Sequence, residues 1–359
     1  MKLAVRLKWG MALVRVCLVM GILWLMKMNA APPTLRLVSQ ADSARLLLRA
    51  GDLAGVLAYL EQPQVLAAFT GEDWLRLGEL HQAAGQWQQA EAAWQQGLLA
   101  GGAELGLYDQ LHSLYRSRGD FPAAVQALRA TLALRPDEPL RAYQLGLYLA
   151  ALQPAESLVY LELAMRDQEL AKPAAALQRA IYTAELEAEP AYTSLQAGRQ
   201  LASLGEWMLA AEAFRQAVLA RPDYAEAWAL LGEARQQVGG DASESLADLE
   251  QALALKPESA LVNSLFALYS ERQGNLEKMI ACITLAAEAE PQNPAWQAEW
   301  GRALALSGDL QAARARYEEA VQLAPRDTGY LRLLAEFSLR HQVDVETLAL
   351  PAARQAVED

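Results

Sequence analysis

Residues 190–222 read PAYTSLQAGRQLASLGEWMLAAEAFRQAVLARP. In both halves of this stretch, small and apolar side chains recur at offsets of three, four and seven residues, which is the spacing of one helical face. Ala210, Phe214 and Ala217 form such a stripe in the second half. Between the halves lies Gly205, a residue type that suits the left-handed conformation at the end of a helix. The stretch therefore predicts two helices joined by a tight turn.

The same spacing returns along most of the chain. Residues that follow a leucine recur at intervals of 34 at three positions: Gly78, His112 and Gly146. Further on, equivalent positions are 34, 34 and 35 residues apart: Gly198, Gly232, Phe266 and Gly301. Prolines recur at intervals of 35, 34 and 34: Pro222, Pro257, Pro291 and Pro325. Because independent positions share one period, the sequence predicts an array of repeated helix pairs.

The individual units share a recognisable pattern. One unit contains Trp228-x2-Leu231-Gly232, and a later one contains Ala313-x3-Tyr317 followed by Pro325. This resembles the tetratricopeptide repeat, whose pattern is W-x2-L-G-x2-Y, then A-x3-F, then P, and the resemblance covers most of residues 71–340. It implies an all-α fold, a right-handed α-solenoid of stacked helix-turn-helix repeats with a concave inner face. We expect about seven such units, with a partial unit at each end.

One irregularity interrupts the period. Gly146 and Gly198 are 52 residues apart, which exceeds one repeat by 18 residues, and Pro154 and Pro173 lie between them. We expect a degenerate unit there, with helices near 155–168 and 174–188. Such a unit could bend the superhelix, or it could reflect sequence drift in a preserved stack, and we favour the preserved stack.

These observations predict a division of the chain into six segments. In chain order, they are an N-terminal signal peptide or membrane anchor (1–33), a partial helical repeat (34–70), tetratricopeptide-like repeats (71–152), a degenerate helical joint (153–190), further repeats (191–327) and C-terminal capping helices (328–359).

The N-terminal segment has the features of an export signal. Residues 2–15 are basic in character, and residues 16–26 form an unbroken apolar run that is followed by small residues. This run is shorter than the roughly 20 residues that span a bilayer, although residues 10–28 could span it with their basic ends at the interfaces. We expect a cleaved signal or an uncleaved anchor; the alternative is an unexported chain with an apolar first helix. Export predicts an extracytoplasmic protein, secreted or anchored to the membrane by this segment alone.

The charge and the cysteines limit the partners and the chemistry. The net charge is −12, and the first 30 residues hold five basic and no acidic residues, so the remainder carries −17. Such a body repels phosphate backbones, and we therefore expect no nucleic-acid partner. Outside the N-terminal segment, Cys282 has no cysteine to pair with. Its apolar surroundings in the sequence predict a small buried hydrophobic residue.

Nothing in the sequence predicts catalysis. His81, His112 and His341 are not accompanied by a cluster of cysteines and carboxylates, so we expect no metal and no cofactor. There is no glycine-rich phosphate loop and no nucleophile elbow. Repeats account for nearly every segment, which leaves no room for a catalytic domain, and the chain is not expected to be an enzyme.

The resemblance also implies where a partner would bind. In tetratricopeptide arrays, the inner face is formed by residues of each first helix that flank its core stripe. Carried over position by position, the candidate partner-binding residues are Glu72, Glu79, Gln82, Asp109, Arg116, Tyr143, Tyr192, Arg199, Glu233 and Gln236. Leu147 belongs to the same expected surface.

The carried-over residues argue against one kind of partner. Some family members clamp the terminal carboxylate of heat-shock chaperones with Lys, Asn and Arg, whereas the matching positions here hold Leu75, Glu79, Asp109 and Ser113. The expected surface is acidic at its N-terminal end and aromatic and aliphatic in the middle, which suits a basic or amphipathic peptide.

The resulting hypothesis is a non-catalytic protein–protein interaction scaffold, exported or membrane-tethered, that binds a peptide or protein in its groove. Two alternatives remain open. One is an accessory subunit that recruits a separate envelope synthase or secretion machine, and the other is a groove carrier for a small apolar ligand.

Overall fold

The computed structural model describes residues 33–346, with side chains from Gln40 onward. Residues 1–32 of the expected export segment therefore lie outside the described residues. Residues 347–359 of the expected C-terminal capping helices also lie outside them. Among the described residues, no helix has the length and apolar character needed to cross a membrane. The chain divides into two compact units, one ending at Leu134 and the other beginning at Arg135.

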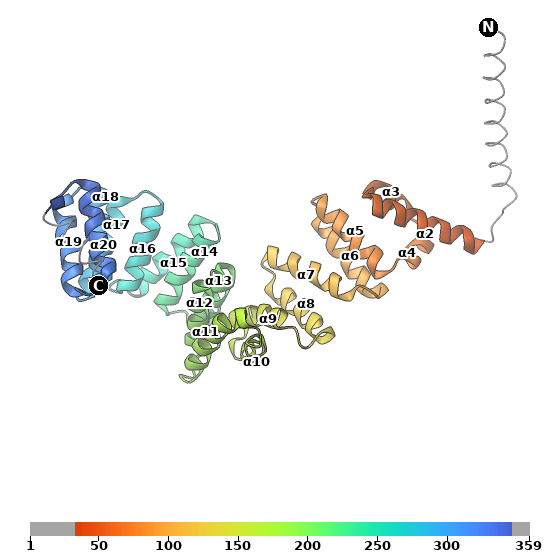
Figure 1. The fold of residues 1–359 in the computed structure, drawn as a ribbon, viewed down its shortest axis with the longest axis horizontal. Coiled ribbons are helices and arrows are strands. Elements are labelled where there is room, and N and C mark those ends of the chain that lie inside the picture. Colours follow the sequence, from red (N-terminus) through yellow and green to blue (C-terminus); the bar gives the residue numbers. More distant parts are fainter. Residues whose placement is uncertain (1–32, 347–359) are drawn as a thin grey trace, which may run out of the picture. The chain divides into compact units, whose positions relative to one another are not determined.

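Unit 1 consists of helices in its described part, and its last four helices pair as two hairpins, α5/α6 and α7/α8. The helices are labelled in Figure 1: α2 (Pro33–Ala50), α3 (Leu53–Leu60), α4 (Pro63–Ala68), α5 (Gly71–Ala83), α6 (Trp87–Ala100), α7 (Glu104–Arg118) and α8 (Phe121–Leu134). Helices α2, α3 and α4 pack on one another, and α2 and α3 also pack on α5, around Leu48, Val56 and Val65.

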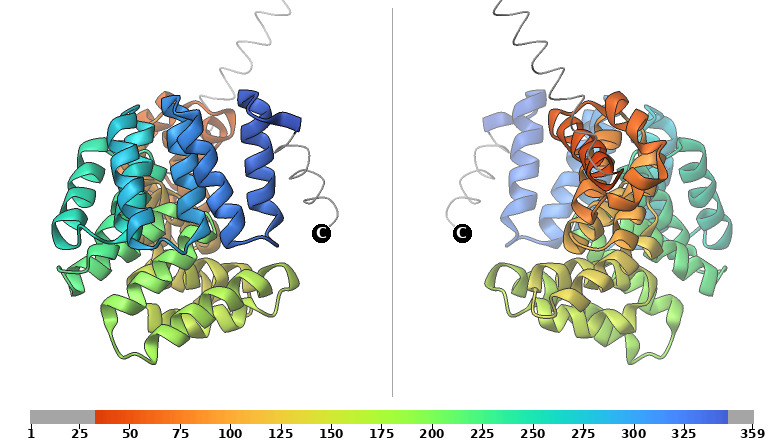
Figure 2. Two further views of the ribbon diagram at one scale, coloured as in Figure 1. Left: turned by 90° about the vertical axis from the view of Figure 1, so that its left-hand side faces the viewer. Right: turned by 90° about the vertical axis from the view of Figure 1, so that its right-hand side faces the viewer.

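Unit 2 is also helical throughout its described part. Its helices are α9 (Pro139–Leu152), α10 (Pro154–Ala164), α11 (Gln168–Glu185), α12 (Pro190–Ser203), α13 (Trp207–Ala220), α14 (Ala225–Gln237), α15 (Ala242–Leu255), α16 (Ala260–Arg272), α17 (Leu276–Ala289), α18 (Pro294–Ser307), α19 (Leu310–Leu323) and α20 (Thr328–His341). Five hairpins, α9/α10, α12/α13, α14/α15, α16/α17 and α18/α19, precede the single helix α20. From α14 to α20 the helices stand side by side in chain order (Figure 2). The predicted fold class, an α-solenoid of stacked helix-turn-helix repeats, is confirmed.

The two helices of a hairpin approach closely where the first carries glycine and the second a large residue. A Cβ atom added to Gly78 would lie 2.1 Å from Nε1 of Trp94, and one added to Gly198 would lie 2.6 Å from Cε1 of Phe214. Trp94 and Phe214 are among the largest fully buried side chains of the described residues. The glycine of the repeat pattern is therefore required by packing.

The turns inside the hairpins also follow the prediction. Gly119 and Gly308 have φ angles of 71° and 89°, in the left-handed region that favours glycine. The residue after each glycine caps the next helix: the Asp120 carboxylate accepts from the backbone N–H of Ala123 at 3.2 Å, and Asp309 accepts from Ala312 at 3.1 Å.

A recurring hydrogen bond fixes the turns between the repeats of unit 2. Three side chains, each six residues after a periodic proline, donate to the carbonyl of that proline: Trp228 to Pro222 at 2.8 Å, Asn263 to Pro257 at 2.6 Å and Gln297 to Pro291 at 3.3 Å. The proline carbonyls lie after a helix end and have no partner within a helix ladder. Each bond therefore ties the end of one repeat to the first helix of the next.

The surplus of 18 residues forms one additional helix. Helix α10 completes an ordinary hairpin with α9, since a Cβ on Gly146 would lie 2.8 Å from a δ-carbon of Leu161. Helix α11, which is 18 residues long, follows it. It buries Ala174, Leu177 and Ile181, which lie on one helical face.

The expected boundaries of the helices in this region were wrong. The expectation of helices near 155–168 and 174–188 took Pro173 as a helix start. Instead, α10 ends at Ala164, and the Asp167 carboxylate starts α11 by accepting from the backbone N–H of Glu169 at 2.8 Å. Pro173 lies inside α11.

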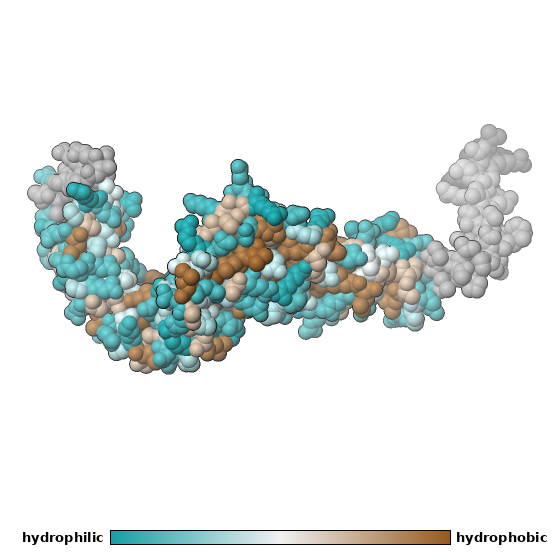
Figure 3. All heavy atoms as spheres, turned by 90° about the horizontal axis from the view of Figure 1, so that it is seen from below, coloured by the Kyte–Doolittle hydropathy of each residue, from teal (hydrophilic) through white to brown (hydrophobic). Residues whose placement is uncertain are grey.

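The favoured expectation of a preserved stack was wrong as well. Helix α11 packs between α10 and α12, in the place against α10 that the next first helix takes in other repeats. Helix α9 instead packs directly against α12 and α13. Hydrophobic side chains gather on the outer face of α10 (Figure 3), where Val159 is 69% exposed.

Candidate functional site

The candidate residues of unit 1 lie on the first helices of its two hairpins. Glu72 and Glu79 of α5 and Arg116 of α7 are exposed, and Gln82 and Asp109 are half-buried. We call the exposed side of the first helices the first-helix surface. In unit 1 this surface carries more carboxylates than basic groups among the candidate residues.

The candidate residues of unit 2 differ in their exposure. Arg199 is exposed, Tyr192 and Gln236 are half-buried, and Glu233 is buried. Tyr143 is also half-buried, and this burial, together with the negative charge of Glu206, raises its pKa.

The expectation that Leu147 lines the groove was wrong. Leu147 is 6% exposed, in the part of unit 2 where α9 packs against α12 and α13. The cause is the inserted helix α11, which changes the neighbours of α9. The first-helix surface of unit 2 therefore begins at α12 and continues over α14, α16 and α18.

Ion pairs join these four first helices to one another. The first-helix ladder consists of three arginine–glutamate pairs: Arg199–Glu226 between α12 and α14, Glu233–Arg272 between α14 and α16, and Glu271–Arg302 between α16 and α18. Each pair joins consecutive repeats, so the ladder fixes the spacing of the first helices.

The pairs of the ladder differ in strength. Arg272 donates to both carboxylate oxygens of Glu233 at 2.8 and 2.9 Å, and the Glu233 side chain is only 9% exposed. The Arg302 guanidinium donates to both oxygens of Glu271 and thereby holds the pKa of that carboxyl below its usual range. Bidentate hydrogen bonds of this kind, between a guanidinium and a carboxylate, are strong and directional. The Arg199–Glu226 pair is a single contact of 3.2 Å between more exposed groups.

Two of the three histidines belong to the packing of unit 1. His81 and His112 are each 6% exposed, and Nδ1 of His81 lies 2.7 Å from Oε1 of Gln86. Within residues 33–346, no group of three or more His, Cys, Asp or Glu side chains is arranged to hold a metal ion. Cys282 is 3% exposed in the core of α17, and burial raises the pKa of its thiol.

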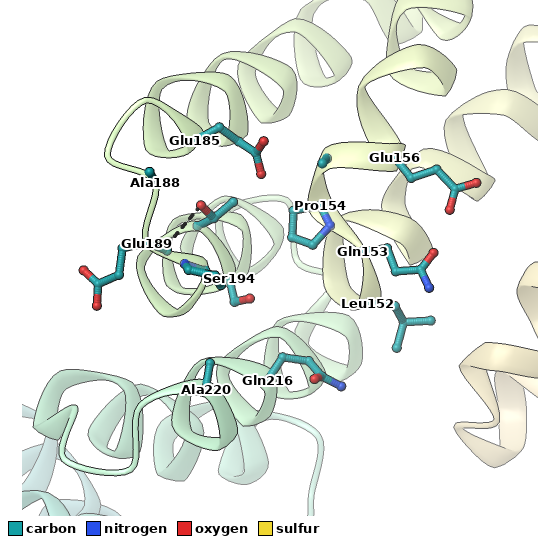
Figure 4. A pocket seen from close by; sticks show the side chains of 13 residues that line it. Leu152, Gln153, Pro154, Glu156, Glu185, Ala188, Glu189, Ser194, Gln216 and Ala220 are labelled. Atoms are coloured by element: carbon teal, nitrogen blue, oxygen red, sulfur yellow. Dashed lines mark hydrogen bonds between the residues drawn. The ribbon is translucent and has the colours of Figure 1, made fainter.

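The structure forms a cleft beside α11 that is absent from the predicted surfaces. The cleft has a volume of about 720 Å³ and lies within unit 2 (Figure 4). Its lining residues come from five helix ends: Leu152, Gln153, Pro154, Ala155, Glu156, Glu185, Ala188, Glu189, Pro190, Thr193, Ser194, Gln216 and Ala220. The surplus of 18 residues was the available signal, because it equals one unpaired helix that must separate two hairpins.

Comparison with known proteins gave matches among solved structures alone. No protein-family model matches the chain, and no curated protein matches it in sequence.

Three of the similar structures illustrate the range of sequence identity and of coverage. The APC/C hetero-tetramer Cut9-Hcn1 is 14% identical, with 89% of this chain and 80% of that chain covered and a TM-score of 0.44. YrrB, described as a TPR protein with an unusual peptide-binding site, is 17% identical over 51% of this chain and 91% of its own, with a TM-score of 0.36. MamA from Desulfovibrio magneticus RS-1 is 17% identical over 63% of this chain and 98% of its own, with a TM-score of 0.32.

Proposed function

We propose that the chain is a non-catalytic scaffold that binds a protein or peptide partner along the first-helix surface of unit 2. The observation that carries the proposal is the first-helix ladder. Its three pairs hold four consecutive first helices in a fixed relation, with Tyr192 and Arg199 at the α12 end. A surface that is already ordered before binding loses little conformational entropy when a partner docks.

The charge of the chain indicates the chemistry of the partner. The part of the chain after residue 30 carries a net charge of −17. Such a body attracts a basic or amphipathic segment and increases its rate of association. An apolar-ligand carrier has less support, because the cleft beside α11 is lined by three carboxylates. An accessory subunit for a larger machine is the same proposal with a more specific partner.

Export is part of the proposal. The basic residues 2–15 and the apolar run of residues 16–26 support a signal or anchor that places the helical repeats outside the cytoplasm. In this proposal, the membrane is contacted through this segment.

Affinity capture from the native membrane fraction tests the proposal. The full-length chain is compared with a Tyr192→Ala/Arg199→Glu variant and with the matched control Tyr182→Ala/Arg179→Glu on α11, where both residues are exposed. We expect one protein to be retained by the native chain and by the control but lost with the first-helix variant. Retention by all three, or equal loss with both variants, would contradict the proposal.

Both variants are expected to fold. The Arg199–Glu226 pair is 40% and 33% exposed, and surface pairs of this kind contribute about 0 to 1 kcal/mol. Circular dichroism and a thermal melt of each variant confirm this before the capture is interpreted.

A further inference from the structure

Another cleft lies in unit 1, between the turn that joins α5 to α6 and the last turn of α7, and we call it the Trp87 cleft. Its volume is about 860 Å³, within the range of sites that hold small molecules or short peptide segments. The residues that line it come from two consecutive hairpins: Gly85, Gln86, Trp87, Gln88, Gln89, Glu91, Leu114, Ser117 and Arg118. The proposed partner surface of unit 2 contributes none of them.

The indole ring of Trp87 is the large apolar group of this cleft. Trp87 stands two residues after the turn glycine, Gly85. At the same position in other turns, the apolar side chain is buried or half-buried: Leu53, Phe121, Trp207, Leu276 and Leu310. Trp87, in contrast, is 47% exposed. Because aromatic side chains are enriched where proteins bind partners, the uncovered ring indicates a ligand that packs on it.

The charges that line the Trp87 cleft compensate each other. Glu91 and Arg118 are the ionisable residues of the lining, and Nη1 of Arg118 donates to Oε2 of Glu91. A charged ligand would either compete with this ion pair or lie in the cleft without a counter-charge. Electrostatic complementarity therefore favours an uncharged ligand.

The polar groups that remain available are chiefly donors. The indole N–H of Trp87 can only donate, and the exposed amides of Gln88 and Gln89 each bring two donor hydrogens and one acceptor oxygen. Within the described residues, these three side chains form no hydrogen bond. Oε1 of Gln86 lies 2.7 Å from Nδ1 of His81, which leaves the NH₂ group of Gln86 available. The cleft therefore suits a ligand with free carbonyl groups and few N–H groups.

A proline-rich segment in the polyproline II conformation has this chemistry. Proline has no backbone N–H, and the carbonyls of a polyproline II helix make no internal hydrogen bonds, so they are free to accept. Proline rings are uncharged and pack on aromatic side chains, and the segment is already extended before it binds. An ordinary peptide brings backbone N–H groups and a saccharide brings hydroxyl donors, and the cleft offers fewer acceptors for them.

We infer that the Trp87 cleft binds a proline-rich segment of a partner protein. A proline ring packs on the indole of Trp87, and carbonyls of the segment accept from the indole N–H and from the amides of Gln88 and Gln89. The inference goes beyond the proposed function, because the site lies in unit 1 and is independent of the first-helix surface of unit 2.

Fluorescence anisotropy with the full-length chain tests the inference. Fluorescein-labelled decaproline is titrated with the chain, and a labelled Gly-Ser peptide of the same length and charge is the control probe. We expect saturable binding of decaproline. The Gly-Ser peptide should bind about tenfold more weakly, since it lacks the proline rings and brings N–H groups.

Variants locate the binding. Trp87→Ala should weaken the binding of decaproline by about tenfold, the order expected for loss of an aromatic anchor. Trp87→Phe keeps a ring but removes the indole N–H, and should weaken it by about threefold. Tyr182→Ala removes another exposed aromatic side chain, on α11, and should leave the affinity unchanged. Because Trp87 and Tyr182 are both exposed, we expect these variants to fold.

NMR spectroscopy identifies the ligand class at the ring itself. The indole N–H signal of Trp87 is assigned by its loss in the Trp87→Phe variant. It should shift on addition of unlabelled decaproline and should not shift on addition of the neutral saccharide maltohexaose.

Four results would overturn the inference. These are no binding of decaproline, equally tight binding of the Gly-Ser peptide, unchanged affinity of Trp87→Ala, or a shift of the Trp87 signal with maltohexaose alone, which would assign the cleft to a saccharide. The Tyr192→Ala/Arg199→Glu variant separates this test from that of the proposed function. It should bind decaproline with the native affinity even though it loses the partner of the first-helix surface.

Discussion

Glu185 is the last residue of α11, at the negative end of the helix dipole, and Glu187 and Glu189 follow it closely. A negative charge there is unfavourable for the helix. We predict that Glu185→Gln raises the free energy of unfolding by about 0.5 kcal/mol. Urea denaturation measures this, and a clear loss of stability would show that the carboxylate supports the fold.

Asp248 of α15 is buried beside Arg235, whose Nη1 lies 3.0 Å from its carboxylate, and Arg235 also pairs with Glu244 at 3.3 Å. Burial raises the pKa of Asp248 to about 6, although the positive charge of Arg235 opposes the shift. Because the pKa of this acid is higher in the folded than in the unfolded chain, its contribution to stability is greatest below about pH 4 and is lost as the pH rises through about 6.

The Asp248→Asn variant tests this pH dependence of the stability. We predict that it unfolds with nearly the same free energy as the native chain at pH 4 and is more stable by on the order of 2 kcal/mol at pH 8. Glu250→Gln, an exposed change on the same helix, controls for the general loss of negative charge. A variant that is less stable at pH 8 would mean that the Arg235 pair outweighs the burial of the carboxylate.

At the scale of the elements, the first-helix ladder predicts unequal effects of two similar substitutions. Arg272→Met removes the guanidinium that donates to both oxygens of the buried Glu233 carboxylate. Removal of a partner from a buried charge costs about 3 kcal/mol. Arg199→Met removes one side of an exposed pair and should cost about 0 to 1 kcal/mol. Equal losses in chemical denaturation would contradict the distinction between the two pairs.

The close approach of α12 and α13 gives a second prediction at this scale. In an ordinary helix, glycine to alanine is stabilising by roughly 0.5–1 kcal/mol. At Gly198 the added methyl would lie 2.6 Å from the Phe214 ring, so we predict a loss of about 1 to 3 kcal/mol.

A double mutant distinguishes this overlap from a general defect. Phe214→Leu frees space beside the new methyl, so Gly198→Ala/Phe214→Leu should lose less stability than the sum of the two single changes. Thermal or urea unfolding of the three variants completes the cycle. Additive losses would mean that the methyl does not meet the ring.

At the scale of the whole molecule, the repeat period was sufficient to predict the hairpins and their turns. These features are local, and each recurs, so several weak signals support one another. Helix α11 could not be placed in this way, because it occurs once and because Pro173 resembles a helix start. The Asp167 cap was visible in the sequence but had no repeated counterpart.

Less of the candidate site than of the fold could be predicted from the sequence. Positions such as Arg199 and Glu79 were predicted as surface and are exposed. The partners of the ladder, however, lie 27 to 39 residues apart without a constant interval, so no sequence pattern reports them. The cleft arises from the contacts of α11 with two hairpins, and a helix count alone could not give its lining.

The central claim is that a partner lies on the first-helix surface of unit 2, and site-specific photocrosslinking in the native membrane tests it most directly. Benzoylphenylalanine replaces Tyr192 on α12 in one full-length chain and the exposed Tyr182 on α11 in another. We predict that one defined protein is captured at position 192, that Arg199→Glu abolishes this capture, and that position 182 does not capture it. Capture of the same protein at both positions, or at position 182 alone, would contradict the claim.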